Sequence, residues 1–384
     1  MNRIVNPFIV YGYVSPEYFC DRKEETSNLI SALRNGRNVT LMSPRRMGKT
    51  GLIHNAFHHI EEEYPDAACF YMDIFSTNSL KDFVMLFGKT VLGKVDTIPQ
   101  KAMSAVNTFL KSCRVMFSVD ELSGMPTASL DFQPHEAEAT LNEIFNYLKH
   151  SERECFIAID EFQQIAEYEE EFEGKSEHSK IEALLRSYIQ FCPNLHFIFS
   201  GSKSHMMSDI FDKPNRPFYR STEKMHLYTI PEESYYTFAS EWMNKADVAM
   251  SEEIFHQIYE RFEGHTWYVQ YVLNKIYEQQ PEQVEASLVT NCIGNIVKSN
   301  TEDYQRLCHQ LTKNQYAVLK AIAKEHRVTS INGSAFLTKY QLKGSSSVNK
   351  AVKSLIDNEY IFNHNGTYQV YDRFMELWLR QQAS

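Results

Sequence analysis

The sequence lacks the features that mark membrane, zinc-binding and disordered proteins. No part of its 384 residues approaches the roughly 18 consecutive apolar residues that a membrane-spanning helix requires. The seven cysteines lie far apart and form no CxxC or Cys/His spacing, which excludes a zinc site and favours buried thiols in a reducing compartment. Residues 1–13 have neither the basic nor the long apolar region of a signal peptide. We therefore expect a cytoplasmic protein with no membrane partner.

Composition and charge indicate several globular domains, of which the last is locally basic. With 43% hydrophobic and 23% charged residues, the chain has enough sequence for about two or three domains, each with its own core. The formal net charge is −10, although residues 311–384 carry 10 Lys and Arg against 5 Asp and Glu, which leaves 29 against 44 for residues 1–310. Such a split is found in proteins with a nucleic-acid-facing module, and it is also compatible with an ordinary solvated surface.

The first 230 residues alternate between strand-like and helical patterns. Short, largely apolar segments predict strands at 38–42, 67–75, 155–159 and 195–200. Helical spacing is present at 26–35, 50–63, 80–95, 134–149 and in a Glu-rich stretch that ends near Phe191, while 115–132 predicts a small inserted hairpin. Strands that alternate with helices are typical of βαβ units. We therefore expect an α/β core with a parallel sheet over residues 1–230.

The remaining residues predict two further domains. From Pro231 the pattern is helical, at 232–245, 251–262, 267–278 and 284–301, which predicts a helical lid domain over residues 231–310. Helical patterns recur at 315–325, 335–340 and 346–358, and two short strands, 360–362 and 367–370, flank the turn His364-Asn365-Gly366. Three helices and a β-hairpin predict a winged helix-turn-helix over residues 311–384.

The residues after the first predicted strand form a phosphate-binding loop motif. Ser43-Pro44-Arg45-Arg46-Met47-Gly48-Lys49-Thr50 matches GxxxxGK[ST] except that Ser43 replaces the first Gly. In such a loop the backbone N–H groups and the next helix's N-terminus surround the phosphates, so a side chain at Gly48 would obstruct the approach. Lys49 would bring positive charge to the β and γ oxygens as a catalytic residue, and the Thr50 hydroxyl would bind Mg²⁺. We expect residues 43–51, Gly51 included, to bind ATP, because no guanine-reading NKxD motif is present.

A second motif supplies the carboxylates that a magnesium site needs. The strand 155–159 leads into Asp160-Glu161, and ligands bind at the carboxyl ends of strands in a parallel sheet. Asp160 would hold Mg²⁺, directly or through water, and Glu161 would be the general base that polarises the attacking water. The alternative is that both acids merely begin an exposed helix over 161–171. Ser202, in Ser200-Gly201-Ser202 after the strand 195–200, would sense the γ-phosphate, unless this tripeptide is only a turn.

These motifs resemble those of the archaeal-type P-loop ATPase family, close to the STAND and origin-recognition initiator branches of the AAA+ group. The loop is similar to the family's GPRRxGKT, residues 159–163 to its DEFQ segment, and residues 264–268 to its GHPYY turn, with Thr266 in place of Pro. Residues 19–25 resemble the N-terminal box beside the nucleotide base, which places Arg22 among the cofactor-binding residues. The resemblance covers most of the chain and implies an AAA+ type core, a helical lid and a C-terminal winged helix.

The resemblance also implies an arginine finger, a cation from a neighbouring subunit that offsets transition-state charge. Arg220 follows Pro217-Phe218-Tyr219 and matches the family's arginine beyond the third strand, while Arg186 lies in the preceding helix. Either arginine could instead pair with surface acids. Arg45 and Arg46 are expected to support the loop rather than to act in catalysis.

The winged helix leaves two kinds of partner open. Its predicted recognition helix carries polar residues suited to DNA phosphates or bases, namely Ser345, Ser346, Ser347, Asn349, Lys350 and Lys353. Winged helices also serve as protein-docking modules, and Leu355 and Ile356 indicate that part of this helix is core.

The sequence thus predicts an enzyme, an ATPase that binds ATP·Mg²⁺ between the core and the helical domain and hydrolyses it slowly. The resulting conformational switch would reposition the winged helix. One alternative is an ATP-regulated protein that binds duplex DNA through residues 311–384. Another is a nucleotide-gated protein-interaction module, related to defence or mobile elements, with a protein partner or a homo-oligomer.

Overall fold

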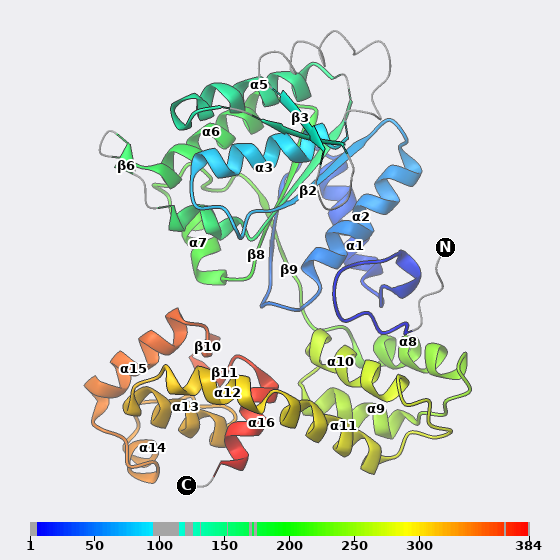
Figure 1. Cartoon of the computed structure of the whole chain (residues 1–384), viewed down its shortest axis with the longest axis vertical. Coiled ribbons are helices and arrows are strands. Elements are labelled where there is room, and N and C mark those ends of the chain that lie inside the picture. The colour runs from blue at the N-terminus through cyan, green and yellow to red at the C-terminus, as the bar shows by residue number, and fades with distance from the viewer. Residues whose placement is uncertain are drawn as a thin grey trace. The chain divides into compact units, whose positions relative to one another are not determined.

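The computed structural model describes residues 6–94, 115–119, 126–130, 132–151, 153–168, 171–172, 175–364 and 366–382 (Figure 1). The chain forms two compact units, one of residues 9–235 and one of residues 1–8 together with 236–384. No helix among the described residues is both long enough and apolar enough to cross a membrane.

The first unit contains an all-parallel sheet with the strand order β2-β5-β8-β1-β9. Its strands are β1 (Val39–Met42), β2 (Ala68–Asp73), β5 (Cys155–Asp160), β8 (Leu195–Gly201) and β9 (Glu223–His226). The predicted α/β fold with a parallel sheet is therefore confirmed. β9 is absent from the sequence prediction because its residues, Glu-Lys-Met-His, are mostly exposed and lack the apolar pattern of the buried strands.

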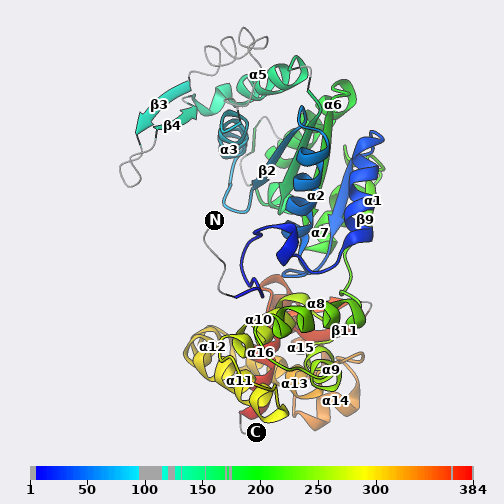
Figure 2. The same cartoon turned by 90° about the vertical axis from the view of Figure 1, so that its right-hand side faces the viewer.

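Helices cover both faces of this sheet (Figures 1 and 2). One face packs against α1 (Lys23–Arg34) and α2 (Lys49–Glu63), which bury Leu29, Leu33, Ile53 and Ile60 against it. The other face packs against α3 (Leu80–Leu92), α5 (Ala137–Lys149), α6 (Glu177–Phe191) and α7 (Ser204–Asp212). β5 and β8 are buried along their whole length, which explains their nearly continuous apolar sequence.

Shorter elements complete the first unit. The antiparallel hairpin of β3 (Val115–Val119) and β4 (Pro126–Leu130) is the small hairpin that the sequence predicts. Three 3₁₀ helices are present among the described residues, η1 (Pro16–Tyr18), η4 (Pro134–Glu136) and η5 (Phe162–Glu167), and a second hairpin joins β6 (Glu171–Phe172) to β7 (Lys175–Ser176). The long helix considered for residues 161–171 is therefore wrong, since only the short η5 follows Glu161.

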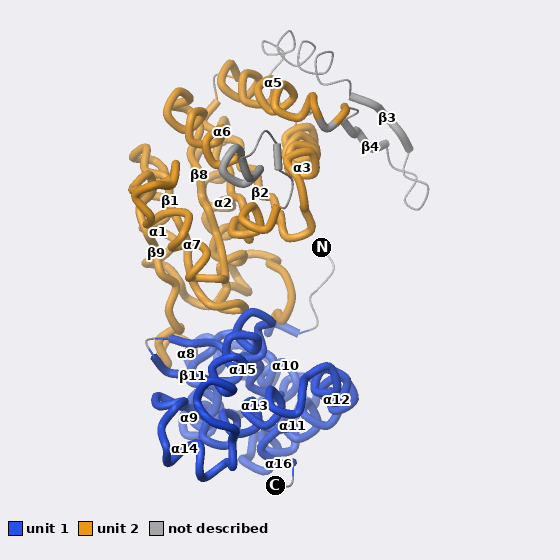
Figure 3. Tube along the Cα trace, turned by 90° about the vertical axis from the view of Figure 1, so that its left-hand side faces the viewer, with its two compact units in different colours: residues 1–8, 236–384 blue, residues 9–235 orange. Residues whose placement is uncertain are grey.

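The second unit combines a helical part with a winged helix (Figure 3). The helices of the first part are α8 (Glu232–Asn244), which crosses the boundary between the units, α9 (Glu252–Arg261), α10 (Thr266–Tyr277), α11 (Ala286–Ser299) and α12 (Thr301–His309). The elements of the second are α13 (Lys313–Glu325), α14 (Ser334–Lys339), α15 (Ser345–Asp357), β10 (Ile361–His364), β11 (Thr367–Val370) and α16 (Arg373–Gln381). Neither α12 nor α16 is part of the sequence prediction, and α16 packs against both α11 and α13.

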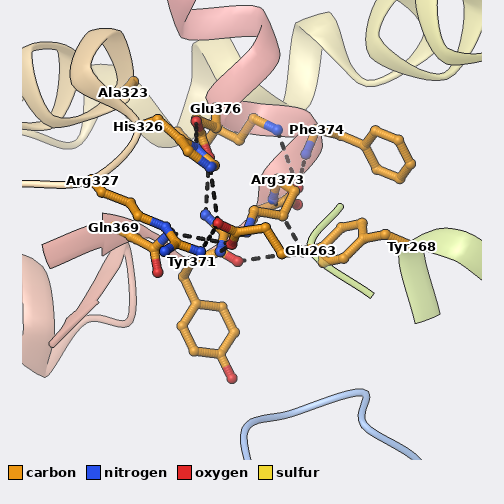
Figure 4. Close-up of polar contacts among 12 residues, drawn as sticks. Glu263, Tyr268, Ala323, His326, Arg327, Gln369, Tyr371, Arg373, Phe374 and Glu376 are labelled. Atoms are coloured by element: carbon orange, nitrogen blue, oxygen red, sulfur yellow. Dashed lines mark hydrogen bonds and ion pairs between the residues drawn. The ribbon is translucent and has the colours of Figure 1, made fainter. Parts of the chain in front are cut away.

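Charged side chains connect α16 to the ends of α9 and α13 (Figure 4). We call this cluster the charged joint, and its members are Glu263, His326, Arg327, Arg373, Glu376 and Arg380. Arg373 bridges the two acids, with Nη2 2.5 Å from Glu263 Oε2 and Nη1 3.1 Å from Glu376 Oε2. His326 bridges them as well, with Nε2 3.1 Å from Glu263 Oε1 and Nδ1 2.6 Å from Glu376 Oε1.

Contacts within the charged joint shift the pKa values of Glu263 and His326. Burial alone would raise the pKa of Glu263, but hydrogen bonds from His326 and Arg327 and the charge of Arg373 lower it to about 2. Hydrogen bonds to Glu263 and Glu376, opposed by burial, raise the pKa of His326 to about 9. His326 is therefore a cation at neutral pH, and it holds the end of α13 to the other helices of this unit.

Candidate functional site

The phosphate-loop motif lies between β1 and α2, at the carboxyl end of the sheet. Gly48 caps α2 with φ +96, a left-handed conformation that favours glycine, and an added Cβ would meet no atom within 4 Å. Glycine is thus required by the backbone, while the space beside it is open, as the approach of a phosphate needs. Ser43 is not among the residues with positive φ, so a side chain is tolerated at the position where the motif usually has its first Gly.

Lys49 is a buried cation at the first position of α2. Its side chain is 6% exposed, and Nζ donates to two backbone carbonyls of the loop, at 3.1 Å to Ser43 and 3.3 Å to Pro44. No carboxylate of a described residue lies within ion-pair distance of it. Burial lowers the pKa of Lys49 although the negative charges of Glu161 and Asp160 oppose this shift. An anion bound at the helix N-terminus would restore the lost solvation.

Thr50 and Asp160, the two residues that the sequence analysis assigns to a magnesium site, are in contact. The Thr50 hydroxyl donates to Asp160 Oδ2 at 2.8 Å, which joins the start of α2 to the end of β5. Hydroxyl and carboxylate oxygens are the ligands that Mg²⁺ prefers, and two such groups are enough because the substrate phosphates and waters complete the coordination. The donor set therefore fits this ion.

Glu161 adopts a left-handed backbone conformation, with φ +54, directly after β5. Its Oε2 accepts hydrogen bonds from Ser202 Oγ at 2.8 Å and from Gln163 Nε2. Gln163 is 2% exposed and packs against Gly201, where an added Cβ would lie 2.4 Å from Gln163 Oε1. The structure thus brings Glu161 and Ser202 together, with the Ser202 hydroxyl contacting the carboxylate.

The sequence prediction assigns no role to three residues that lie at the site, Tyr71, Asp73 and Gln163; the first two lie on β2 and the third on η5. Asp73 ends β2, paired in register with Asp160, and Tyr71 on the same strand donates to Asp160. Asp73 is exposed, yet partial desolvation and the charges of Asp160 and Glu161 raise its pKa, although its hydrogen bond from the Phe75 N–H opposes this. Asp73 could have been predicted from the sequence, because it is a carboxylate at the end of an apolar strand, as Asp160 is. Gln163 lies within the DEFQ-like segment, and Tyr71 gives no sequence signal.

The N-terminal box, residues 19–25, contacts the phosphate-binding loop. Arg22 is 2% exposed, and its guanidinium donates to the Met47 carbonyl at 3.3 Å and to the Tyr228 carbonyl at 2.6 Å. The Phe19 ring packs on the first turn of α2, where a Cβ on Gly51 would lie 2.8 Å from it. Arg22 thus contacts the loop backbone at Met47, the backbone after β9 at Tyr228, and the Glu25 carboxylate at 2.8 Å, and Gly51 makes room for the box.

The remaining loop arginines lie toward the surface. The Arg45 guanidinium lies 5.7 Å from the centre of the exposed Phe75 ring, and Arg46 has φ +65. Arg45 opposes protonation of the nearby Lys49 by its positive charge. Arg45 is partly exposed and Arg46 is exposed.

Of the two arginines that follow β8 in the chain, Arg216 forms an ion pair and Arg220 is exposed. Arg216 forms an ion pair with Glu182, a fully buried acid of α6 whose pKa burial raises to about 7 against the effect of Arg216. Arg220 is exposed, with its guanidinium 5.3 Å from the centre of the Tyr219 ring, and makes no ion pair with a described residue. Arg186, on α6, is partly buried.

The polar face of α15 is exposed. Ser345, Ser346, Asn349, Lys350 and Lys353 are solvent-accessible, whereas Val348, Ala351, Val352 and Leu355 are buried in the unit. Asn349 Oδ1 accepts a hydrogen bond from Asn332 Nδ2 at 2.7 Å. The core role expected for Leu355 is therefore observed, and the predicted recognition residues form a separate surface.

The parallel sheet, the loop with its left-handed glycine, and the Thr50–Asp160 pair together define a P-loop nucleotide-binding fold of the AAA+ type, followed by a winged helix. Solved structures with this architecture include a Walker-type ATPase of Pyrococcus abyssi, with a TM-score of 0.67 and 15% identity over 97% of this chain and 99% of that one.

Two proteins of Aeropyrum pernix are similar as well. Its ORC2 protein, in ADPNP and ADP complexes, matches with a TM-score of 0.58 and 14% identity over 98% of this chain and 95% of that one. Its ORC1 protein in complex with DNA matches with a TM-score of 0.52 and 10% identity over 95% and 93%. At these identities the likeness shows the fold, and it agrees with the resemblance seen in the motifs.

A family model described as a probable winged helix domain matches residues 302–381. No curated protein matches the sequence. The C-terminal winged helix is therefore supported by sequence and by structure.

Proposed function

We propose that the chain is a P-loop ATPase that binds ATP·Mg²⁺, hydrolyses it slowly to ADP and phosphate, and uses the bound nucleotide as a conformational switch. The observation that carries this proposal is Lys49, a cation buried at a helix N-terminus whose Nζ bonds to backbone carbonyls of its own loop. Such an arrangement is costly unless an anion binds there. The adjacent Thr50–Asp160 pair supplies the oxygens for a divalent cation.

The residues of the site have distinct roles in the proposed reaction. Residues 43–51 would surround the phosphates through their N–H groups, and Lys49 would stabilise charge on the γ-phosphate. Thr50 and Asp160 would hold Mg²⁺, which when bound neutralises negative charge on the phosphate oxygens. Glu161, oriented by Ser202 and Gln163, would polarise the attacking water. Arg220, exposed on the surface, would act in trans from a second copy.

Two substitutions separate binding from hydrolysis. Lys49→Ala is expected to abolish nucleotide binding, measured by titration with a fluorescent ATP analogue, because the buried positive charge is lost. Glu161→Gln is expected to bind as the wild type does and to release phosphate at least about 100-fold more slowly, the range for loss of a general base. Unchanged phosphate release in both variants would exclude the proposal.

A second candidate function is ATP-regulated binding of duplex DNA. It is favoured by the exposed polar face of α15 and by the similarity in fold to the ORC1 protein that is solved with DNA. Lys350→Ala combined with Lys353→Ala should then weaken DNA binding and reduce its dependence on salt, because about two phosphate contacts are lost. DNA binding that is absent in the wild type at low salt would instead favour the nucleotide-gated protein-interaction module.

A further inference from the structure

Tyr71 of β2 reaches the carboxylate at the end of the neighbouring strand. Its Cα is paired with that of Ala158, two residues before Asp160 in β5, and its hydroxyl donates to Asp160 Oδ2 at 2.8 Å. A long side chain such as that of tyrosine is needed to span this offset of two residues along β5. Tyr71 is therefore placed to act on Asp160 rather than on a nucleotide.

The Asp160 carboxylate is fixed by donors from three directions. Oδ2 accepts from Tyr71 and from Thr50, each at 2.8 Å, and Oδ1 accepts from the Glu161 N–H at 3.0 Å. Asp160 is 3% exposed, so water has little access to replace a missing donor. Of these three donors, the Thr50 hydroxyl is also the proposed ligand of Mg²⁺, and the Glu161 N–H belongs to the backbone. The Tyr71 hydroxyl is the remaining side-chain donor, and its bond to Asp160 is the one role assigned to it.

A stack of rings holds Tyr71 in this position. The His54 ring of α2 lies 4.5 Å from the Tyr71 ring, and Tyr13, from the segment before α1, stacks on His54 at 5.8 Å with an interplanar angle of 17°. The Tyr13 hydroxyl donates to Asn55 Oδ1 at 3.1 Å. The ring contacts link the N-terminal segment, α2 and β2, and they pack against the Tyr71 ring whose hydroxyl meets Asp160.

We propose that Tyr71 is a positioning residue for the magnesium carboxylate: its hydroxyl fixes the orientation in which Asp160 binds a divalent cation. This inference rests on the proposed function, because it assumes a divalent cation at Asp160. Partners of metal-binding side chains of this kind set the ligand's direction and basicity. The role is distinct from that of Thr50, which would contact the ion itself.

The test is Tyr71→Phe, which removes the hydroxyl and leaves the ring and its stack. We expect the affinity for Mn²⁺, titrated against the full-length protein with saturating ADP and followed by electron paramagnetic resonance, to fall at least about 10-fold, the effect usual for such partners. The affinity for ADP in the presence of EDTA should be unchanged. In turnover assays the Mg²⁺ concentration for half-maximal rate should rise by the same factor, while the rate at saturating Mg²⁺ recovers.

Tyr13→Phe is the matched control, because it removes a hydroxyl from the same ring stack that bonds to Asn55 and not to Asp160. It should bind Mn²⁺ as the wild type does. A Tyr71→Phe variant that unfolds at the wild-type temperature and binds Mn²⁺ with wild-type affinity overturns the inference, while the proposed ATPase stands. A wild-type protein that binds neither ADP nor Mn²⁺ with ADP overturns both.

Discussion

The proposed nucleotide site and the charged joint are both clusters of charged side chains, yet they distribute their charges in opposite ways. In the joint every acid meets a base: Glu263 and Glu376 each accept from both Arg373 and His326. In the site the cation Lys49 bonds to carbonyls, while Asp160 and Glu161 accept from hydroxyls, an amide and a backbone N–H. The charges of the joint pair with one another within the protein, whereas the site keeps its opposite charges apart, as the proposed binding of a nucleotide and a cation would need.

Whether buried charges pair with one another distinguishes a structural cluster from a binding site. Burying separated charges costs free energy, and a protein tolerates this cost where function needs it. Burying mutually paired charges costs less, and the loss of one partner is then the expensive event. Substitutions should therefore reduce stability in the joint and reduce binding or catalysis in the site.

The largest expected effect on stability is in the joint. Arg373→Ala leaves Glu376, which is 3% exposed, and Glu263 without their shared guanidinium. Because His326 still contacts both acids, the free energy of unfolding should fall by about 2 kcal/mol, less than for a buried charge left with no partner. Urea unfolding followed by circular dichroism measures this loss. Arg327→Ala is the matched control, because Arg327 pairs with the same Glu263 from a position that is 59% exposed and should cost less than about 1 kcal/mol. Equal losses in the two variants would contradict the distinction.

A smaller effect, on catalysis, is expected in the site. In Gly201→Ala the new Cβ would clash with Gln163 Oε1 and with Met207 Sδ, so we expect the Gln163 amide to shift and its hydrogen bond to Glu161 to weaken. Single-turnover phosphate release should slow by about 10-fold, a part of what a general base contributes, with ATP affinity unchanged. Gly294→Ala, in α11 with no atom within 4 Å, should change neither quantity. A Gly201→Ala variant with the wild-type rate would show that Gln163 does not orient Glu161.

The smallest effect is the pH dependence of the joint. The pKa of His326 rises on folding from 6.5 to about 9, so its contribution is full below pH 6.5 and is lost as the pH rises through about 9. The pKa of Glu263 falls from 4.5 to about 2, so its contribution is full above pH 4.5 and is lost as the pH falls through about 2. The joint should thus be most stabilising between about pH 4.5 and 6.5.

Thermal unfolding at a series of pH values tests this window. His326→Gln should unfold at a lower temperature than the wild type at pH 6.5, and the two curves should converge as the pH rises beyond about 9, where wild-type His326 is neutral. A difference between the two proteins that stays constant from pH 6.5 to 10 would mean that the charge of His326 contributes nothing.

Much of the fold can be predicted from local patterns. β5 and β8 can be predicted from their continuous apolar sequence, which reflects burial of both their faces. Residues 43–50 can be predicted from their motif, because the backbone geometry of the loop requires it. β9 and α16 could not be predicted. β9 is mostly polar, and its strand conformation comes from pairing with β1. α16 places Arg373 and Glu376 among its buried apolar residues, where the joint pairs their charges.

The site divides in the same way. Lys49, Thr50, Asp160 and Glu161 follow from motifs, since each is adjacent in sequence to the strand that places it. Tyr71 and Asp73 do not, because their relevance arises from the register between β2 and β5. Arg22 is predicted beside the nucleotide, and the structure places its guanidinium on the carbonyls of Met47 and Tyr228.

Local sequence patterns are enough to predict the fold: a parallel α/β sheet, a phosphate loop with its acidic partner strand, and a C-terminal winged helix. Each of these features depends on a short segment whose periodicity or motif indicates one local structure. The tertiary structure alone decided which donors fix Asp160 and Glu161, and that the charges around Glu263 satisfy one another. Those contacts join residues that are distant in the chain, and their geometry depends on strand register and helix packing, which no local pattern specifies.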